Sequence, residues 1–184
     1  ARRSMTGDEL AAWVDSIFPG IELALYDSSA VATSIHRDLP VAITLGFSSV
    51  DTGLTMQGDP DTQVACEIVV RGDVDKQVLA TTAVEAARMV AGLGVPAQPG
   101  VLLEDLFTRA DAPDWATVRH GMLREPELFE LGTPLYREPG QLTLLLELVA
   151  LTDDEFRIVS EQGYPALSRR LRRRDVDVAD WFRD

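Results

Sequence analysis

A run of almost unbroken aliphatic residues from Leu142 to Leu151 is the feature that most constrains the fold of this chain. The run is too short to cross a bilayer as a helix, which takes about 20 residues, and its density suits a strand covered on both faces. Thr152 follows at once and Glu155 comes three residues later, a spacing that allows a capping box at the start of a helix. The stretch Gln141–Gly163 therefore predicts a buried strand that leads directly into a capped helix, from Asp153 to about Gln162.

Length and composition are those of an ordinary globular protein. The chain has 184 residues, 46% of them hydrophobic and 26% charged, which suffices for one domain, residues 1–184, with a sizeable core. No apolar run approaches the length of a membrane helix, and the N-terminus lacks the basic-then-apolar layout of a signal peptide. The single cysteine excludes an internal disulfide. We therefore expect a cytoplasmic domain without a membrane partner.

The charge of the chain narrows the class of partner. A net charge of −13 repels the phosphates of nucleic acids and anionic lipids, so we predict no nucleic-acid binding. The same charge speeds the encounter with a basic protein. A protein partner, in particular a basic one, is therefore the expectation.

Helices are predicted where apolar residues recur at intervals of three or four. Thr6 and Glu9 repeat the capping-box spacing, and the helix that they open ends at Pro19-Gly20. The longest helix is expected from Lys76 to about Leu93, where glycines end it. Gly163-Tyr164-Pro165 separates the capped helix described above from a last helix.

Strands are predicted from apolar segments at 21–25 (half-buried), 41–47, 64–70 and 115–124. Residues 28–35 have no clear period, and residues 101–106 fit either a strand or the start of a loop. The glycines and proline of Ser48–Thr62 predict a long loop or a hairpin connection. Together these elements predict an α+β (mixed α/β) fold, with a central mixed β-sheet flanked by helices.

Cys66 is the first candidate for chemistry. It alternates in phase with Val64, Ile68 and Val70, which places its side chain on the apolar face of a strand and favours a buried structural thiol. A nucleophile would need exposure and a neighbouring base, and His36 and His120 are the only histidines. A cysteine-dependent hydrolase that uses Cys66 with one of these histidines is therefore kept as an alternative function.

Other short motifs lack the context that their chemistry requires. His36-Arg37-Asp38 matches the start of a kinase catalytic loop, but Pro40 follows and the accompanying motifs are missing. Gly92-x-Gly94 follows a helix and not a strand, so it does not indicate a dinucleotide site. Asp59-x-Asp61 and Asp73-x-Asp75 lack the glycine and glutamate of a calcium loop. We therefore predict no catalytic, cofactor-binding or metal-binding residue.

One basic cluster, Arg169-Arg170-Leu171-Arg172-Arg173-Arg174, interrupts the acidic chain. Arginines in the last turns of a helix favour the negative end of its dipole, and Asp175, Asp177 and Asp180 follow closely. We therefore expect a solvated face or one in which the arginines pair with these aspartates.

Several segments together resemble a known family. They are Phe129-Glu130-Leu131, the run Leu142–Leu151, Thr152–Phe156 and Glu161-Gln162-Gly163 with the Ala166-Leu167 that follows. In this order they resemble the suppressor of fused (SUFU) domain, with Ala150 at a position where that family usually has proline. The resemblance is clearest over 119–177.

The resemblance implies a mixed α/β domain without enzymatic activity or cofactor. Animal relatives bind a transcription factor, partly by accepting a peptide strand, and bacterial relatives look like immunity proteins that neutralise polymorphic toxins. Because Lys76 is the only lysine among many arginines, we expect a bacterial source with a high genomic G+C content. The first hypothesis is therefore an immunity protein that binds a basic toxin domain. A structural or regulatory subunit that homodimerises through Trp181 and Phe182 is a further alternative.

Overall fold

The strand predicted from the aliphatic run lies at the centre of the sheet. The structure is a computed structural model that describes residues 6–50, 53–110 and 112–184. Within these residues a nine-stranded mixed sheet has the order β1-β2-β3-β5-β9-β7-β6, and the short β4 and β8 pair with β5 and β9. The strands are β1 (Glu22–Tyr26), β2 (Ser29–His36), β3 (Leu39–Leu45), β4 (Thr55–Met56), β5 (Asp59–Arg71), β6 (Leu102–Leu103), β7 (His120–Arg124), β8 (Leu135–Glu138) and β9 (Gln141–Leu151).

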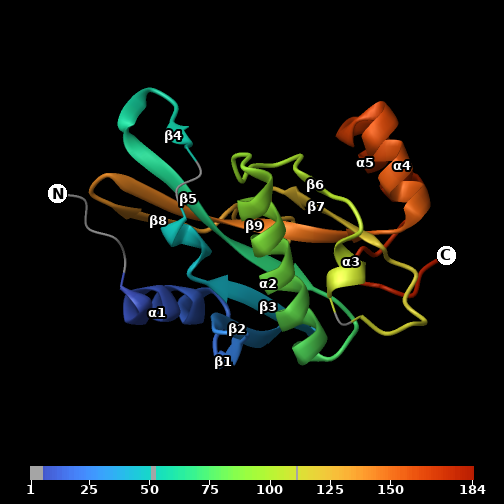
Figure 1. The fold of residues 1–184 in the computed structure, drawn as a ribbon, viewed down its shortest axis with the longest axis horizontal. Helices are drawn as coiled ribbons and strands as arrows, with labels where there is room; N and C mark the ends of the chain where they lie inside the picture. Colours follow the sequence, from blue (N-terminus) through green and yellow to red (C-terminus); the bar gives the residue numbers. More distant parts are fainter. Residues whose placement is uncertain (1–5, 51–52, 111) are drawn as a thin grey trace.

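Helices cover both faces of the sheet, so the α+β expectation is confirmed (Figure 1). They are α1 (Gly7–Ile17), α2 (Lys76–Leu93), α3 (Leu106–Arg109), α4 (Asp153–Gln162) and α5 (Tyr164–Arg173), with a short 3-10 helix at Phe47–Ser49. One face of the sheet packs against α2 and α3. The opposite face packs against α1 at one end and against α4 and α5 at the other.

The side chains of β9 show why its sequence has no polar alternation. Leu146 and Leu148 point into the core beneath α2, whereas Leu145 packs beneath α1 and Val149 beneath α4 and α5. Because both faces of this strand are covered, every position favours an apolar residue except where charges are paired. β9 lies parallel to β5 and antiparallel to β7 and β8.

The predicted capping box at the start of α4 is present. The Thr152 hydroxyl accepts a hydrogen bond from the Glu155 backbone N–H, and the Glu155 carboxylate accepts one from the Thr152 N–H at 2.9 Å. Thr6 caps α1 in the same way by accepting from the Glu9 N–H. Both helices therefore begin where the spacing predicts.

Strand boundaries differ more from the sequence expectations. The unassigned residues 28–35 form most of β2, and the segment 48–62, of which 51–52 lie outside the described residues, holds β4 and the first part of β5. Only His120–Arg124 of the predicted strand 115–124 is a strand, and β8 was not predicted. The strand near residues 21–25 is mostly exposed, because β1 is the edge of the sheet and α1 lies over β3 instead.

The burial of Trp181 argues against the alternative of a homodimer through Trp181 and Phe182. The Trp181 ring is fully buried, with the Phe107 ring centroid at 5.0 Å, and a Cβ on Gly72 would lie 2.8 Å from it. The backbone on either side is also held, because the Thr117 N–H donates to the Trp181 carbonyl and the Trp181 N–H donates to Asp73. Trp181 therefore anchors the tail in the core of its own chain and is not available to a second subunit.

None of the helices in the described part of the chain combines the length and the apolar character that crossing a membrane requires.

Candidate functional site

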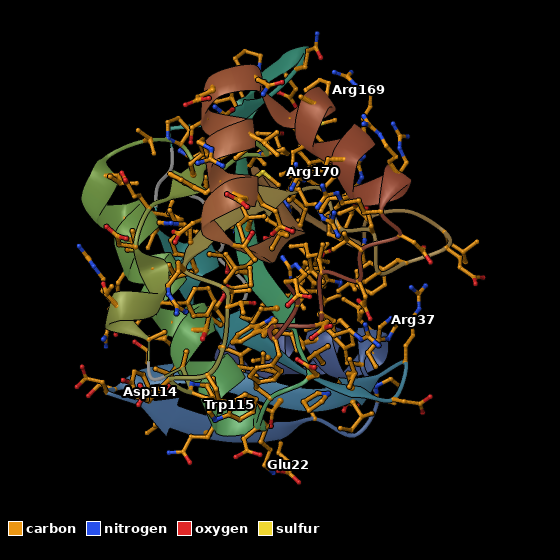
Figure 2. The ribbon with its side chains drawn as sticks, turned by 90° about the vertical axis from the view of Figure 1, so that its right-hand side faces the viewer. Glu22, Arg37, Asp114, Trp115, Arg169 and Arg170 are labelled. Carbon is orange, nitrogen blue, oxygen red and sulfur yellow. The ribbon has the colours of Figure 1, made fainter. Side chains whose placement is uncertain are left out.

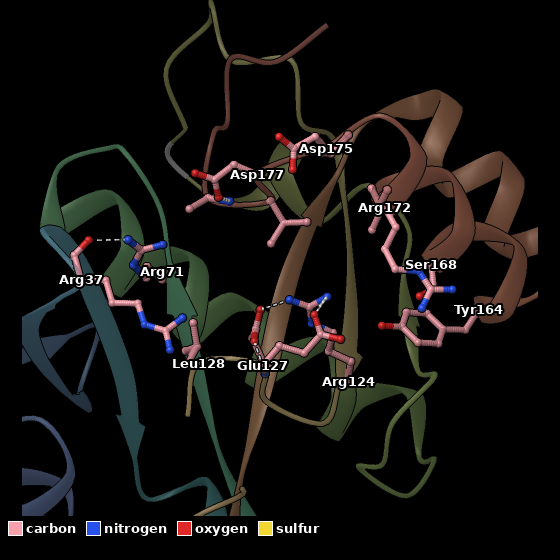
Figure 3. A pocket seen from close by; sticks show the side chains of 15 residues that line it. Arg37, Arg71, Arg124, Glu127, Leu128, Tyr164, Ser168, Arg172, Asp175 and Asp177 are labelled. Atoms are coloured by element: carbon pink, nitrogen blue, oxygen red, sulfur yellow. Dashed lines mark hydrogen bonds and ion pairs between the residues drawn. The ribbon is translucent and has the colours of Figure 1, made fainter. Parts of the chain in front are cut away.

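A polar pocket lies on the sheet face that α1 shares with α4 and α5, in the interval between these helices (Figure 3). Its volume is about 440 Å³. We call it the split pocket, because it opens where two central strands separate. β5 pairs with β9 only as far as Val69 and Glu147, and the end of β5 pairs with β3 instead, up to Arg71 opposite Val41. The divergence leaves a stretch of the sheet face without a helix above it.

Charged side chains form the floor of the split pocket. Arg71, Arg124 and Glu147 line it from three strands, β5, β7 and β9. Arg124 donates to Glu147 at 2.7 Å, and its second terminal nitrogen lies 3.0 Å from the Glu127 carboxylate. The Glu147 carboxylate also accepts from the Glu127 backbone N–H. The floor is therefore an ion-paired network set into an otherwise apolar face of the sheet.

Arg124 is the most constrained member of this floor. Burial by itself lowers the pKa of Arg124, but the carboxylates of Glu147 and Glu127 raise it above its ordinary value. The side chain is more than nine-tenths buried, yet its Nε has no hydrogen-bond partner within the part of the chain that the structure describes. A buried donor without a partner costs about 1–3 kcal/mol.

The walls of the pocket come from two distant parts of the chain, the β2–β3 turn and the segment from α5 onward. Arg37 lies in the β2–β3 turn at φ 51°, and Arg71 donates to the carbonyls of His36 and Arg37. Tyr164 and Arg172 come from α5 on the opposite wall (Figure 3). The segment after α5, including the acidic residues Asp175 and Asp177, completes the rim.

The arginines of α5 do not form the ion pairs with Asp175, Asp177 and Asp180 that the sequence suggested. Asp177 accepts from the Ala179 N–H and Asp180 from the Phe182 N–H, so these carboxylates shape the tail. Within the described residues the arginines of α5, and Arg174 after it, have no carboxylate partner, and all except the half-buried Arg170 are exposed. The alternative of a solvated face is therefore correct (Figure 2).

The pocket is lined by four arginines and by four carboxylates, those of Glu127, Glu147, Asp175 and Asp177, in an otherwise acidic protein. Arg37, Arg71 and Arg172 line it without an ion-pair partner among the described residues, and Arg169 and Arg170 lie on the same side of the molecule (Figure 2). Guanidinium donors suit carboxylates and main-chain carbonyls. The arrangement is therefore equipped to hold a polar segment of another molecule, and it contains no nucleophile with an adjacent base.

Comparison with solved structures identifies this architecture. A SUFU homologue from Neisseria gonorrhoeae FA 1090 matches with a TM-score of 0.69 and 10% sequence identity, over 95% of this chain and 93% of that chain. A chain of the Sufu-Fu complex matches with a TM-score of 0.71 and 11% identity, over 99% of this chain and 92% of that chain. The chain has the SUFU-like fold.

A third match to the same fold covers only part of the other protein. Drosophila Suppressor of Fused aligns with a TM-score of 0.51 and 12% identity, over 84% of this chain and 42% of that chain. The sequence matches no model of a protein family, and no curated protein matches it. The resemblance seen in the sequence over 119–177 is thus supported by three-dimensional structure, which extends it to nearly the whole chain.

Within this SUFU-like fold Cys66 is a core residue. Its side chain packs with Ile68 and Val70 in the core beneath α2, as the alternation of β5 predicts. Burial raises the pKa of the Cys66 thiol well above its ordinary value, and the neighbouring Glu67 carboxylate raises it further. A neutral, buried thiol is a poor nucleophile.

The two histidines are engaged elsewhere. His36 donates from Nε2 to the Leu128 carbonyl at 2.9 Å and packs against the rings of Phe18 and Phe129. His120 lies 2.7 Å from the Asp153 carboxylate through Nε2, and its Nδ1 accepts from the Asp105 N–H. The structure therefore does not bring either ring to Cys66 as a base.

The other short motifs have local structural roles. Asp59 accepts from the Asp61 N–H and the Thr62 hydroxyl in a turn, and Asp73 holds the Trp181 N–H. His36 ends β2, and Arg37 and Asp38 form the turn that leads into β3. Among the residues that the structure describes, no group of His, Cys, Asp and Glu has a geometry that would hold a metal ion.

Sequence reasoning missed the charged floor of the split pocket, although a signal was present. Glu147 interrupts the leucine run of β9, and Arg124 ends the buried strand β7. A single charge inside a strand covered on both faces demands a partner, because an isolated buried charge is too costly. Glu67 in β5 is a second buried charge, and hydrogen bonds stabilise it in place of an ion pair. Its carboxylate accepts from the Thr44 hydroxyl and from three backbone N–H groups, those of Gly46, Phe47 and Ser48.

Proposed function

We propose that residues 1–184 form one non-enzymatic protein-binding domain, and that the partner docks a polar segment into the split pocket. The guanidinium groups of Arg37, Arg71 and Arg172 carry this proposal, because they line a solvent-open pocket and have no ion-pair partner among the described residues. The complex named for one of the structural matches, Sufu-Fu, supports the view that this fold is used to bind protein.

The finer proposal is that the chain is a bacterial, cytoplasmic immunity protein that neutralises a toxin domain. The net charge of −13 attracts a basic domain over a distance and raises its association rate. The arginines around the split pocket then recognise carboxylates or carbonyls on one segment of that domain. The acidic surface thus provides capture and the pocket provides specificity.

The test is to co-express the chain with the product of the neighbouring gene and to measure growth and complex formation. We expect the wild-type chain to restore growth and to co-purify with that product. The substitution Arg172→Glu, combined with Arg37→Glu, should abolish both effects because it reverses the charge of two pocket walls. Absence of a complex and of rescue with the wild-type chain would refute the immunity function.

A matched control separates the loss of a pocket contact from a general change in the charge of α5. Arg169 is an exposed arginine on the same helix that does not line the pocket. Arg169→Glu should therefore leave binding within about threefold of wild type, since a lone surface charge contributes little. Equal losses in Arg169→Glu and Arg172→Glu would argue against the split pocket as the docking site.

Ionic strength gives a second, independent readout. If the acidic surface steers the partner, the association rate falls steeply with added salt, whereas the dissociation rate changes little. Surface plasmon resonance at low and high salt measures both rates. An association rate that does not depend on salt would exclude capture by long-range charge.

A further inference from the structure

The edge strand β1 carries two exposed leucines, and the backbone groups on its outer side pair with no other strand of the described residues. Leu23 is 63% exposed and Leu25 is 76% exposed. Among the described residues β1 pairs on one side only, with β2, and it forms one edge of the sheet. Edges of this kind are usually protected by lysine, proline or a bulge. The sequence Glu-Leu-Ala-Leu-Tyr of β1 has neither residue, and its register with β2 runs without a shift.

The hairpin register decides which backbone groups face outward. Asp27 and Ser28 form the turn with φ values of 49° and 69°, which makes Tyr26 and Ser29 the hydrogen-bonded pair that closes a type I′ hairpin. Hydrogen-bonded and non-hydrogen-bonded pairs alternate along an antiparallel ladder. Leu23 and Leu25, opposite Ala32 and Ala30, are thus non-hydrogen-bonded to β2. Their N–H and C=O groups point to the open edge.

We propose that β1 pairs antiparallel with β1 of a second copy of this chain, about a two-fold axis at Ala24. In this register Leu23 lies opposite Leu25 of the partner subunit, and the same pair recurs on the other side of the axis. The outward backbone groups of both leucines then form hydrogen-bonded pairs, and the sheet continues from one subunit into the next. The strand is complementary to itself in backbone and in side chains.

Electrostatics permits two acidic chains to meet at this edge. Glu22 pairs with Lys76, and Asp27 pairs with Arg88 at 3.0 Å. The carboxylates at both ends of β1 are therefore neutralised by cations from α2. Lys76 is the only lysine of the chain. A chain with a net charge of −13 thus has a locally balanced edge.

The helices leave room for the second copy. Both α1 and α2 make more contacts with β3 than with β1. In the continued sheet the two β3 strands are five strand spacings apart, about 24 Å. Helices with a diameter of about 10–12 Å on these strands do not collide. Leu23 and Leu25 of both subunits would form one apolar strip on the face of the sheet that α1 covers.

Sedimentation velocity over a dilution series tests the proposal. The wild-type chain should change from monomer to a species of twice its mass as concentration rises. Leu25→Lys should abolish that species, because it places cations beside the two-fold axis. Ile35→Lys is the matched control, since Ile35 is also 63% exposed but lies on β2. A wild-type chain that stays monomeric at the limit of solubility, or equal loss in both variants, would overturn the proposal.

Cysteine crosslinking tests the register and does not depend on the lysine variants. In the proposed pairing the two Ala24 Cα atoms are about 4.5 Å apart, within the range of a disulfide. The two Leu23 Cα atoms are diagonal neighbours at about 7–8 Å or more, beyond that range. Mild oxidation should therefore crosslink Ala24→Cys and leave Leu23→Cys uncrosslinked, with Cys66 buried in both. Crosslinking of Leu23→Cys alone, or of neither variant, would refute this register.

Discussion

Arg124 and Glu147 form an ion pair of 2.7 Å between two central strands, with both side chains less than a tenth exposed. The pair lies at the floor of the split pocket, next to the point where β5 leaves β9. Attraction in such a place must repay the loss of hydration of both charges. The pair therefore fixes the position of the Arg124 guanidinium more than it adds to stability.

Removing one member of the pair should be more costly than replacing both. Glu147→Gln leaves the buried Arg124 with only the exposed Glu127 as partner, and we expect a loss of about 3 kcal/mol in the free energy of unfolding. The double change Arg124→Met with Glu147→Leu should lie closer to wild type. Urea denaturation measures each variant. Glu127→Gln is the control and should cost at most about 1 kcal/mol, so an equal loss there would contradict this account.

The raised pKa of Glu67 predicts how the free energy of unfolding changes with pH. Burial raises the pKa of Glu67 above its ordinary value, although hydrogen bonds from Ser48, Thr44 and Gly46 offset part of that rise. A carboxyl whose pKa is raised on folding binds more protons in the folded state. Its contribution to stability is complete below its unfolded pKa and is lost as the pH rises through the folded pKa.

Glu67→Gln isolates that contribution. At about pH 4.5 we expect the variant to lose about 2 kcal/mol, because the amide nitrogen of glutamine would face backbone N–H groups from which the carboxyl oxygens accept hydrogen bonds. The difference between wild type and variant should shrink as the pH rises from about 4.5, since only the wild type titrates there. Urea denaturation across this range measures it. A difference that grows with pH would show that hydrogen bonding outweighs burial at this carboxyl.

Cys66 should be inert in the folded protein. Burial raises the pKa of its thiol, so the thiolate that alkylation requires is scarce, and the side chain is closed to reagents. We expect iodoacetamide to leave the native chain unlabelled and to label the urea-unfolded chain fully, as read by intact mass. Rapid labelling in the native state would reopen the hydrolase alternative.

The two tryptophans near the C-terminal tail should behave differently on truncation. Trp181 is fully buried, so Trp181→Ala should destabilise the chain by about 3–5 kcal/mol. Trp115 stacks on Phe182 at 3.8 Å but is 69% exposed, so Trp115→Ala should cost less than about 1 kcal/mol. Thermal unfolding measures both. Equal effects would show that the tail is not anchored through Trp181.

Oligomer mass distinguishes this anchoring role from the earlier idea of a dimer through the tail. Since Trp181 packs within its own chain, folded Trp115→Ala should keep the mass of the wild type at every concentration. If Trp115→Ala lost the dimer and Leu25→Lys kept it, the interface would lie at the C-terminal tail and not at β1.

Several elements follow from the sequence alone, because their physics is local. The capping box of Thr152 and Glu155 involves groups three residues apart, and α4 begins where that spacing predicts. The length of α2 follows in the same way from its periodicity and the glycine that ends it. The uninterrupted leucines of β9 require cover on both faces wherever the strand lies, so its central position could be predicted.

Only the tertiary structure determined what the charged and aromatic residues do. Glu147, Arg124 and Arg71 are far apart in sequence and meet because β5, β7 and β9 are neighbours and β5 then diverges. Strand order and divergence depend on pairing between distant segments, and no local pattern encodes that pairing. The same holds for Trp181, whose burial depends on the space left above Gly72. Local spacing set the helices and the central strand, and long-range packing set the pocket, the edge and the buried tail.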